Sequence, residues 1–481
     1  MDAVRAPARR TAPLPLAPLL SLALAIPNGL LAGPIASAAP LPSSAAPRAA
    51  AAAAPSSGRV SAASTTAIEP GAVNRTSINI TATYAVTATL AVDTGRLHVM
   101  TTMTVRNDSG AGIDRVELNT IAARLGSITI TSASVDGSPR ALTIKDQTLL
   151  VPLGGVLPDG ATAQVKVAYW ATLRNSLSGS NWLFTRYGGT ISMYRWIPWI
   201  SIQRPFDRPN HGDPFITPTS PQVSVKLTLD KARVLAAPTA NVPKTASKTW
   251  AFTVTKVRDV NLSLAPDFSV TTTTVHGITI RAYSRPGGVS GSTLASQARL
   301  ALDREAARVG VRYGWTSFTI VETAAGGYGM ESPRMVWIPS NTLSGNMIYL
   351  VHHEVAHQWF YGLVGNDQQR EPFADEAAAD LLARTVLGTL RGSRCAKDEL
   401  DRHITAYTAA CYYETIYIQG GNVLNGFRAS MGTTLFWNTI KSYVTDYSHR
   451  LGGTKLLLDR LKAASPVDLT PTLHSRFPTL Y

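Results

Sequence analysis

Apolar and polar residues alternate with a period of two over much of the chain between about residues 72 and 275. The clearest stretches are 78–86, 97–105 and 223–229, with turns rich in Gly, Asn and Asp elsewhere in this region. This period places the apolar side chains on one face of each strand, and short strands with such turns are typical of all-β domains. We therefore predict an N-terminal all-β domain over residues 71–275, built as a twisted sheet or a sandwich.

From residue 276 onward, helical spacing of apolar residues becomes dominant. Strands are predicted at 278–283, 318–321 and 335–339, and helices at 292–313, 344–363, 372–390, 398–410, 419–431, 434–446 and 454–463. In the helix at 292–313, apolar residues recur every three or four positions, which indicates one buried face. Residues 276–481 are thus expected to form a second, mainly helical domain, and the predicted fold class is multidomain α+β.

The first 70 residues have a different character. Residues 1–38 combine a basic start, an apolar run and Ala36-Ser37-Ala38, a pattern typical of a cleaved export signal. Residues 39–70 are rich in Ala, Pro and Ser and indicate a flexible linker. We expect a secreted protein with no stable membrane span after signal removal. An uncleaved anchor is the alternative.

Composition and charge narrow the function classes. The chain has 481 residues, 45% of them hydrophobic, and a formal net charge of +14. It has neither a dense Lys/Arg run nor a nucleic-acid-binding motif, so no nucleic-acid partner is expected. Only ten Glu occur, and four of them (Glu331, Glu354, Glu371 and Glu376) fall within residues 331–376. This concentration of carboxylates indicates a position for a cation.

Cys395 and Cys411 are the only cysteines. In an exported protein, an even number of cysteines close in sequence predicts a disulfide, whereas in the cytosol the two would be ordinary thiols.

The candidate chemistry is concentrated in the sequence His353-Glu354-Val355-Ala356-His357. Two histidines four residues apart share one face of a helix and can bind the same metal ion. The intervening Glu354 can accept a proton from a metal-activated water. A hydrolytic zinc site needs a third protein ligand, and Glu376, 19 residues after His357, begins the helix that follows Pro372.

The spacing of His353, His357 and Glu376 resembles the zinc signature of aminopeptidase N-type gluzincins. Three further sequence motifs support the resemblance. Gly327-Tyr328-Gly329-Met330-Glu331 is similar to the family's G-x-M-E-N element, and Asp375-Glu376-Ala377 is similar to its Asn-Glu-Gly motif. Tyr417-Ile418-Gln419-Gly420 is similar to its Tyr-x-x-Gly segment. The resemblance covers about residues 75–465. It implies an N-terminal saddle domain and a thermolysin-like catalytic domain.

The resemblance also implies roles for individual residues. His353, His357 and Glu376 would bind one zinc ion, and Glu354 would be the general base. Tyr417 would donate a hydrogen bond to the oxyanion. Glu331 would bind the free ammonium of a peptide or protein substrate, and the segment Gly327, Tyr328, Gly329 and Met330 would contact the extended peptide.

Several of these assignments have alternatives. The oxyanion donor could be Tyr412 or Tyr413 instead of Tyr417, and Glu331 could be a surface carboxylate. Asp380 could orient a ligand histidine or be exposed. Glu371 is expected in a loop or at a helix cap, and His352 is expected to point away from the ligands.

The chain ends about 100 residues after Glu376, so the resemblance implies a short form without the family's helical C-terminal domain. The expected reaction is removal of N-terminal residues from peptides. Two rivals remain: a zinc endopeptidase with the same metal site, and a non-catalytic extracellular protein with a zinc site. The sequence does not indicate an oligomeric state.

Overall fold

The computed structural model describes residues 67–206, 215–324, 328–390, 392, 395 and 399–481. The predicted export signal, residues 39–66 of the predicted linker and Gly327 lie outside these ranges. The described residues all belong to one compact unit. Within the described ranges, no helix is both long and apolar enough to cross a bilayer.

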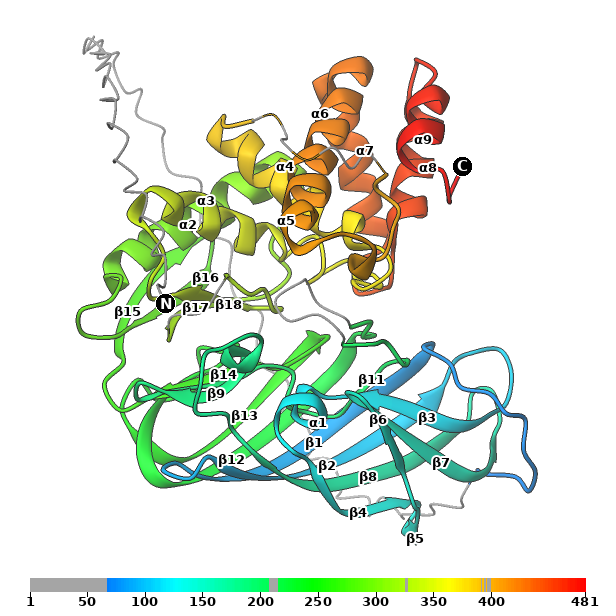
Figure 1. The fold of residues 1–481 in the computed structure, drawn as a ribbon, viewed down its shortest axis with the longest axis vertical. Coiled ribbons are helices and arrows are strands. Elements are labelled where there is room, and N and C mark those ends of the chain that lie inside the picture. Colours follow the sequence, from blue (N-terminus) through cyan, green and yellow to red (C-terminus); the bar gives the residue numbers. More distant parts are fainter. Residues whose placement is uncertain (1–66, 207–214, 325–327, 391, 393–394, 396–398) are drawn as a thin grey trace, which may run out of the picture. The chain divides into compact units, whose positions relative to one another are not determined.

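The N-terminal half of the chain contains the predicted all-β domain (Figure 1). Its larger sheet has the strand order β5-β4-β8-β2-β1-β12-β14-β10-β9, with β13 paired to β12. The strands are β1 (Ile80–Ala91), β2 (Arg96–Asn107), β4 (Thr129–Val135), β5 (Ser138–Pro139), β8 (Thr162–Thr172), β9 (Phe184–Tyr187), β10 (Thr190–Met193), β12 (Ser220–Ala236), β13 (Ser247–Val257) and β14 (Leu262–Ala265). Every second residue of β1 is buried, which confirms the alternation seen in the sequence.

A second sheet has the order β11-β3-β7-β6. Its strands are β3 (Ile113–Asn119), β6 (Thr143–Lys145), β7 (Thr148–Leu157) and β11 (Trp199–Ile200). Tyr84 of β1 stacks on Trp199 of β11 with ring centroids 4.2 Å apart, and its hydroxyl accepts a 3.0 Å hydrogen bond from the Ile200 N–H. The aromatic pair therefore joins the buried faces of the two sheets.

A third sheet opens the second half of the chain, in the order β15-β16-β17-β18. Its strands are β15 (Ser269–Val275), β16 (Ile278–Ser284), β17 (Ser317–Thr323) and β18 (Met335–Pro339). His276 and Gly277 both have positive φ and form the two-residue turn between β15 and β16. The predicted domain boundary between residues 275 and 276 falls inside this hairpin.

Helices make up most of the remaining chain (Figure 1). The α-helices are α1 (Ile121–Leu125), α2 (Gly291–Val309), α3 (Ser344–Ala356), α4 (Glu376–Leu387), α5 (Ala409–Tyr412), α6 (Gly420–Met431), α7 (Thr433–Asp446), α8 (Thr454–Ala464) and α9 (Thr470–Arg476). Short 3₁₀ turns are η1 (Asn181–Leu183), η2 (Pro372–Ala374) and η3 (Ile404–Ala406), and η4 (Tyr413–Gln419) is a π-helix. Helix α2 contacts the third sheet and α3, and α3 contacts α4.

Two helix predictions are wrong in extent. Helix α3 ends at Ala356 instead of residue 363, because Tyr361 has a φ of 110° and its N–H bonds the Val364 carbonyl in a tight turn. The helix predicted at 398–410 is absent from the described part of that range, which holds only a 3₁₀ turn and the start of α5. There the Tyr407 hydroxyl donates to the Glu399 carbonyl and holds an irregular loop.

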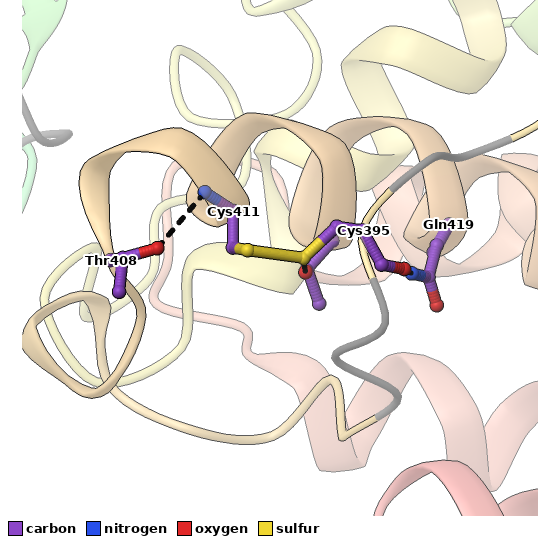
Figure 2. Close-up of a disulfide and its surroundings, with 5 residues drawn as sticks. Cys395, Thr408, Cys411 and Gln419 are labelled. Carbon is purple, nitrogen blue, oxygen red and sulfur yellow. Dashed lines mark hydrogen bonds between the residues drawn. A yellow bond between two sulfur atoms is a disulfide. The ribbon is translucent and has the colours of Figure 1, made fainter.

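Cys395 and Cys411 form a disulfide, as predicted for an exported protein (Figure 2). Gln419 Nε2 donates to the Cys395 carbonyl at 2.6 Å, and the Cys411 N–H donates to Thr408 Oγ1 at 3.2 Å. The disulfide thus joins Cys395, which precedes the 399–408 loop, to Cys411 in α5, which follows it. Helix α5 leads directly into η4.

We predict that a Cys395→Ser/Cys411→Ser variant loses up to about 3 kcal/mol of unfolding free energy, because the bridge closes a short loop in the unfolded chain. Denaturant titration of both proteins with and without dithiothreitol measures the loss. The reductant should destabilise the wild type and leave the variant unchanged. Equal stabilities of the oxidised wild type and the variant would contradict the prediction.

Candidate metal centre and active site

Helix α3 brings His353 and His357 to one face. His353 lies in its last turn, and His357 is the C-cap residue with helical dihedrals (φ −62°, ψ −9°), so the four-residue spacing still aligns the two rings. Glu376 is the first residue of α4, and its N–H donates to the Asp375 side chain at 2.8 Å. Contact between α3 and α4 therefore brings the third side chain to the two histidines.

The three predicted ligand atoms form an equilateral triangle. His353 Nε2, His357 Nε2 and Glu376 Oε2 are each 3.2 Å from the other two. Ligands bound tetrahedrally to zinc at 2.0–2.1 Å are about 3.3 Å apart. Among the described residues, these three side chains form the group of His, Cys, Asp and Glu that could hold a metal ion, and all three are buried.

The hydrogen bonding around His357 favours metal binding. His357 Nδ1 lies 3.1 Å from the Phe360 carbonyl, which can only accept, so Nδ1 carries the proton. Nε2 therefore presents its lone pair to the centre of the triangle. Three electron pairs 3.2 Å apart repel one another unless a cation or a proton lies between them, so the donor set fits a metal ion.

The electrostatics of the cluster also favour positive charge. Burial lowers the pKa of His357, but the charges of Glu376, Glu331 and Glu354 outweigh it and raise the pKa well above its ordinary value. Burial raises the pKa of Glu376, whereas His357 and His353 bring it below its ordinary value. The carboxylates thus stabilise a cation at the centre of the site.

Glu354 is close enough to the triangle for its charge to raise the pKa of His357, and Gly329 packs against Glu354. A Cβ atom added to Gly329 would lie only 2.2 Å from Glu354 Oε1, so the main chain of this loop touches the carboxylate. Glu354 is 4% exposed. Only glycine, which has no Cβ, lets the main chain come this close to the Glu354 carboxylate. This contact explains the glycine at position 329 without any requirement from the turn.

Tyr417 lies in η4 and stacks on His353, with ring centroids 5.2 Å apart. Burial and the charge of Glu376 raise the pKa of Tyr417 well above its ordinary value, so its hydroxyl keeps the proton that it would donate. Burial and Glu376 raise the pKa of Tyr412 in the same way. The Tyr413 hydroxyl instead lies 3.4 Å from the hydroxyl of Tyr349. Tyr417 and Tyr412 therefore remain the candidates for the oxyanion donor.

Glu331 is buried, with 6% of its surface exposed, so the surface alternative is wrong. Its Oε1 accepts a 2.9 Å hydrogen bond from Gln368 Nε2. The preceding Met330 pairs with Trp337 of β18 through two main-chain hydrogen bonds. Tyr328 is 59% exposed and, of the three predicted contact residues that the structure describes, is the most open to solvent.

Three other acidic or histidine side chains have structural partners. Asp380 is buried, so the exposed alternative is wrong. Its carboxylate pairs with Arg384 at 2.9 Å and accepts a hydrogen bond from Tyr349 instead of bonding a ligand histidine. The ring of Tyr349 lies 5.7 Å from that of His353. Glu371 accepts from the N–H of Thr454, the first residue of α8, and is a helix cap as expected. His352 points away from the ligands and contacts the buried Glu305 at 2.9 Å.

Sequence reasoning missed two residues near the site, Gln368 and Arg195. Both are at least 95% buried, and both belong to the hydrogen-bond chain that ends at Glu331. In the sequence, Gln368 lies between His357 and Glu376, the second and third predicted ligands, and this is a weak indication that it lies near the site. Nothing in the sequence links Arg195 to position 368.

We predict that Glu376→Ala lowers bound zinc from about one ion per chain to a small fraction, because two protein ligands replace three. Metal analysis after dialysis against trace zinc measures the occupancy. Glu371→Ala is the matched control and should keep the metal, since Glu371 caps α8. Unchanged zinc in Glu376→Ala would show that another group is the third ligand.

No protein-family model matches the sequence, and no curated protein sequence matches it. Solved structures do match. An M1 zinc metallopeptidase from Deinococcus radiodurans has a TM-score of 0.61 and 19% identity, covering 80% of this chain and 90% of that chain. A mutant M1 zinc metallopeptidase from the same organism, bound to a Tyr-Ser-Ala substrate, has a TM-score of 0.61 and 19% identity, covering 85% and 95%.

A mutant two-domain M1 zinc metallopeptidase bound to L-arginine gives a TM-score of 0.61 and 19% identity, with 83% of this chain and 93% of that chain covered. At this identity the comparison establishes the fold. The chain has an N-terminal β domain followed by a mixed α/β region with helices, as in two-domain M1 zinc metallopeptidases.

Proposed function

We propose that this protein is a zinc-dependent aminopeptidase that hydrolyses N-terminal residues from peptides. The observation that carries the proposal is the triangle of His353, His357 and Glu376, with the carboxylate of Glu354 near enough to act on the charge of His357. A purely structural metal site has no use for an adjacent base, whereas hydrolysis requires one. The similarity in fold to two-domain M1 zinc metallopeptidases supports the same proposal.

His353, His357 and Glu376 would hold the ion, which when bound supplies Lewis acidity to polarise the scissile carbonyl and to lower the pKa of a water molecule. Glu354 accepts a proton from the attacking water and delivers it to the leaving amine. Of the two candidate tyrosines, Tyr417 stacks on the ligand His353 and is assigned as the oxyanion donor, and its protonated hydroxyl would form its strongest hydrogen bond in the transition state.

Glu331 would make the site prefer substrates with a free N-terminus. A buried carboxylate pairs with a free α-ammonium through a charge-assisted hydrogen bond, and an internal peptide bond cannot provide that charge. Glu331 is close enough to the metal ligands for its charge to raise the pKa of His357. Its position therefore supports binding of the first substrate residue next to the ion.

Export is part of the proposal. It is supported by the signal-like pattern of residues 1–38 and by the Cys395–Cys411 disulfide, since such bonds persist mainly in oxidising compartments. Mass spectrometry of the mature protein from the culture medium tests it. Cleavage after Ala38 is expected, and a protein found only inside reduced cells would contradict it.

We predict that Glu354→Gln keeps zinc and loses hydrolysis by at least about 100-fold, because the amide cannot accept the proton of water. Rates are compared on an unblocked peptide and its N-acetylated counterpart. The zinc-loaded wild type should prefer the unblocked peptide. Equal rates on both would favour the endopeptidase alternative, and no hydrolysis of either would favour a non-catalytic zinc protein.

We also predict that Gly329→Ala lowers kcat by about 100-fold without loss of zinc, because its Cβ would displace the Glu354 carboxylate. Gly345→Ala is the matched control: a Cβ there meets no atom within 4 Å. Steady-state kinetics and zinc content are measured for both variants. Wild-type kcat in Gly329→Ala would show that Glu354 does not need its observed position.

A further inference from the structure

We propose that Gln368 and Arg195 are positioning residues for Glu331 and thereby set the preference for a free N-terminal amine. This inference rests on the proposed aminopeptidase function. The three side chains form a continuous chain of hydrogen bonds. Arg195 Nη2 donates to Gln368 Oε1 at 2.8 Å, and Gln368 Nε2 donates to Glu331 Oε1 at 2.9 Å.

Glutamine has the chemistry that this link requires. Arginine can only donate and an ionised carboxylate can only accept, so a residue that bridges them must accept at one end and donate at the other. The same constraint fixes the orientation of the Gln368 amide. Because Gln368 is 4% exposed, water cannot easily substitute for either bond.

The amide bridge also preserves the charge of Glu331. A direct salt bridge with Arg195 would compete with the substrate ammonium for the same carboxylate. The neutral amide instead holds one oxygen of Glu331 and adds no positive charge next to it. Glu331 is thus oriented while its charge remains for the substrate.

Arg195 is a rigid anchor for this chain. It follows β10 in the N-terminal β domain, is 4% exposed, and its guanidinium carbon lies 4.3 Å over the ring of Phe215. Arg195 Nε donates to the Tyr194 hydroxyl at 2.9 Å, and Nη2 also donates to the Tyr361 hydroxyl at 2.8 Å. The main chain of Gln368 is held as well, since its N–H donates to the Phe215 carbonyl at 3.1 Å.

A second tether holds the residue after Glu331. The Ser332 hydroxyl donates to Asp259, which also accepts from Tyr361, and the Ser332 carbonyl accepts a 2.9 Å hydrogen bond from Gln358 Nε2. Asp259 lies 3.7 Å from Arg195. Both tethers therefore lead back to the same buried arginine, so the N-terminal β domain sets the position of the carboxylate.

The test is a double-mutant cycle with Gln368→Met, Glu331→Gln and the double variant, each loaded with zinc. Methionine keeps the length of the side chain and removes both hydrogen bonds. We expect kcat/KM on an unblocked tripeptide to fall roughly tenfold in Gln368→Met, mainly through KM, with little change on the N-acetylated tripeptide. In the Glu331→Gln background the same substitution should have almost no effect.

Gln369→Met is the matched control, because Gln369 is equally buried (5% exposed) and its carbonyl accepts from Ile404. It should leave both rates unchanged. Zinc content and melting temperature verify folding, and Gln368→Leu replaces Gln368→Met if the latter misfolds. An unchanged ratio of the two rates, an equal loss on both peptides, or the same loss in the Glu331→Gln background would overturn the inference.

These results are separable from failure of the proposed function. If the zinc-loaded wild type hydrolyses neither tripeptide, or both equally, the aminopeptidase proposal fails and this inference falls with it. If the wild type prefers the unblocked tripeptide and Gln368→Met keeps that preference, only the inference fails.

Discussion

The constraint on which the site depends is the burial of several carboxyl groups in one place. Glu331, Glu354, Asp375 and Glu376 are each less than 9% exposed. Close, desolvated negative charges are unfavourable unless a cation or a proton compensates them. Burial and the charge of Glu376 accordingly raise the pKa of Asp375 well above its ordinary value. The two histidines, and a cation held by their triangle with Glu376, would meet this need. The neutral bridge from Gln368 to Glu331 orients the carboxylate without compensating its charge.

The N-terminal β domain supports the site through two buried arginines. Arg195 leads to Glu331, and Arg258 donates to the carbonyls of Thr217, Gly362 and Leu363, which joins the β domain to the turn after α3. Burial lowers the pKa of Arg258 to about 10, so it remains charged at neutral pH. Glycine at position 365 leaves room for this guanidinium, since a Cβ there would lie 2.1 Å from it. The turn that follows His357 is therefore fixed from the β domain.

What the sequence could predict was local. His353 and His357 are related by the helix period, Glu376 starts the helix after Pro372, and the strands of the β domain follow from alternation. The missing parts depend on contacts between distant residues: Arg195 meets Gln368 across 173 positions. The π-helix that contains Tyr417 and the irregular loop at 399–408 also have no periodic signal, because tertiary contacts and the disulfide shape them.

We propose that this buried cluster uses one zinc ion to hydrolyse peptides from their amino end. The most direct measurement is a mass-spectrometric time course of an unblocked decapeptide with the zinc-loaded protein and with the protein after zinc removal. We expect a ladder of products shortened one residue at a time from the amino end, formed only with zinc. Internal fragments without such a ladder, or an intact peptide, would contradict it.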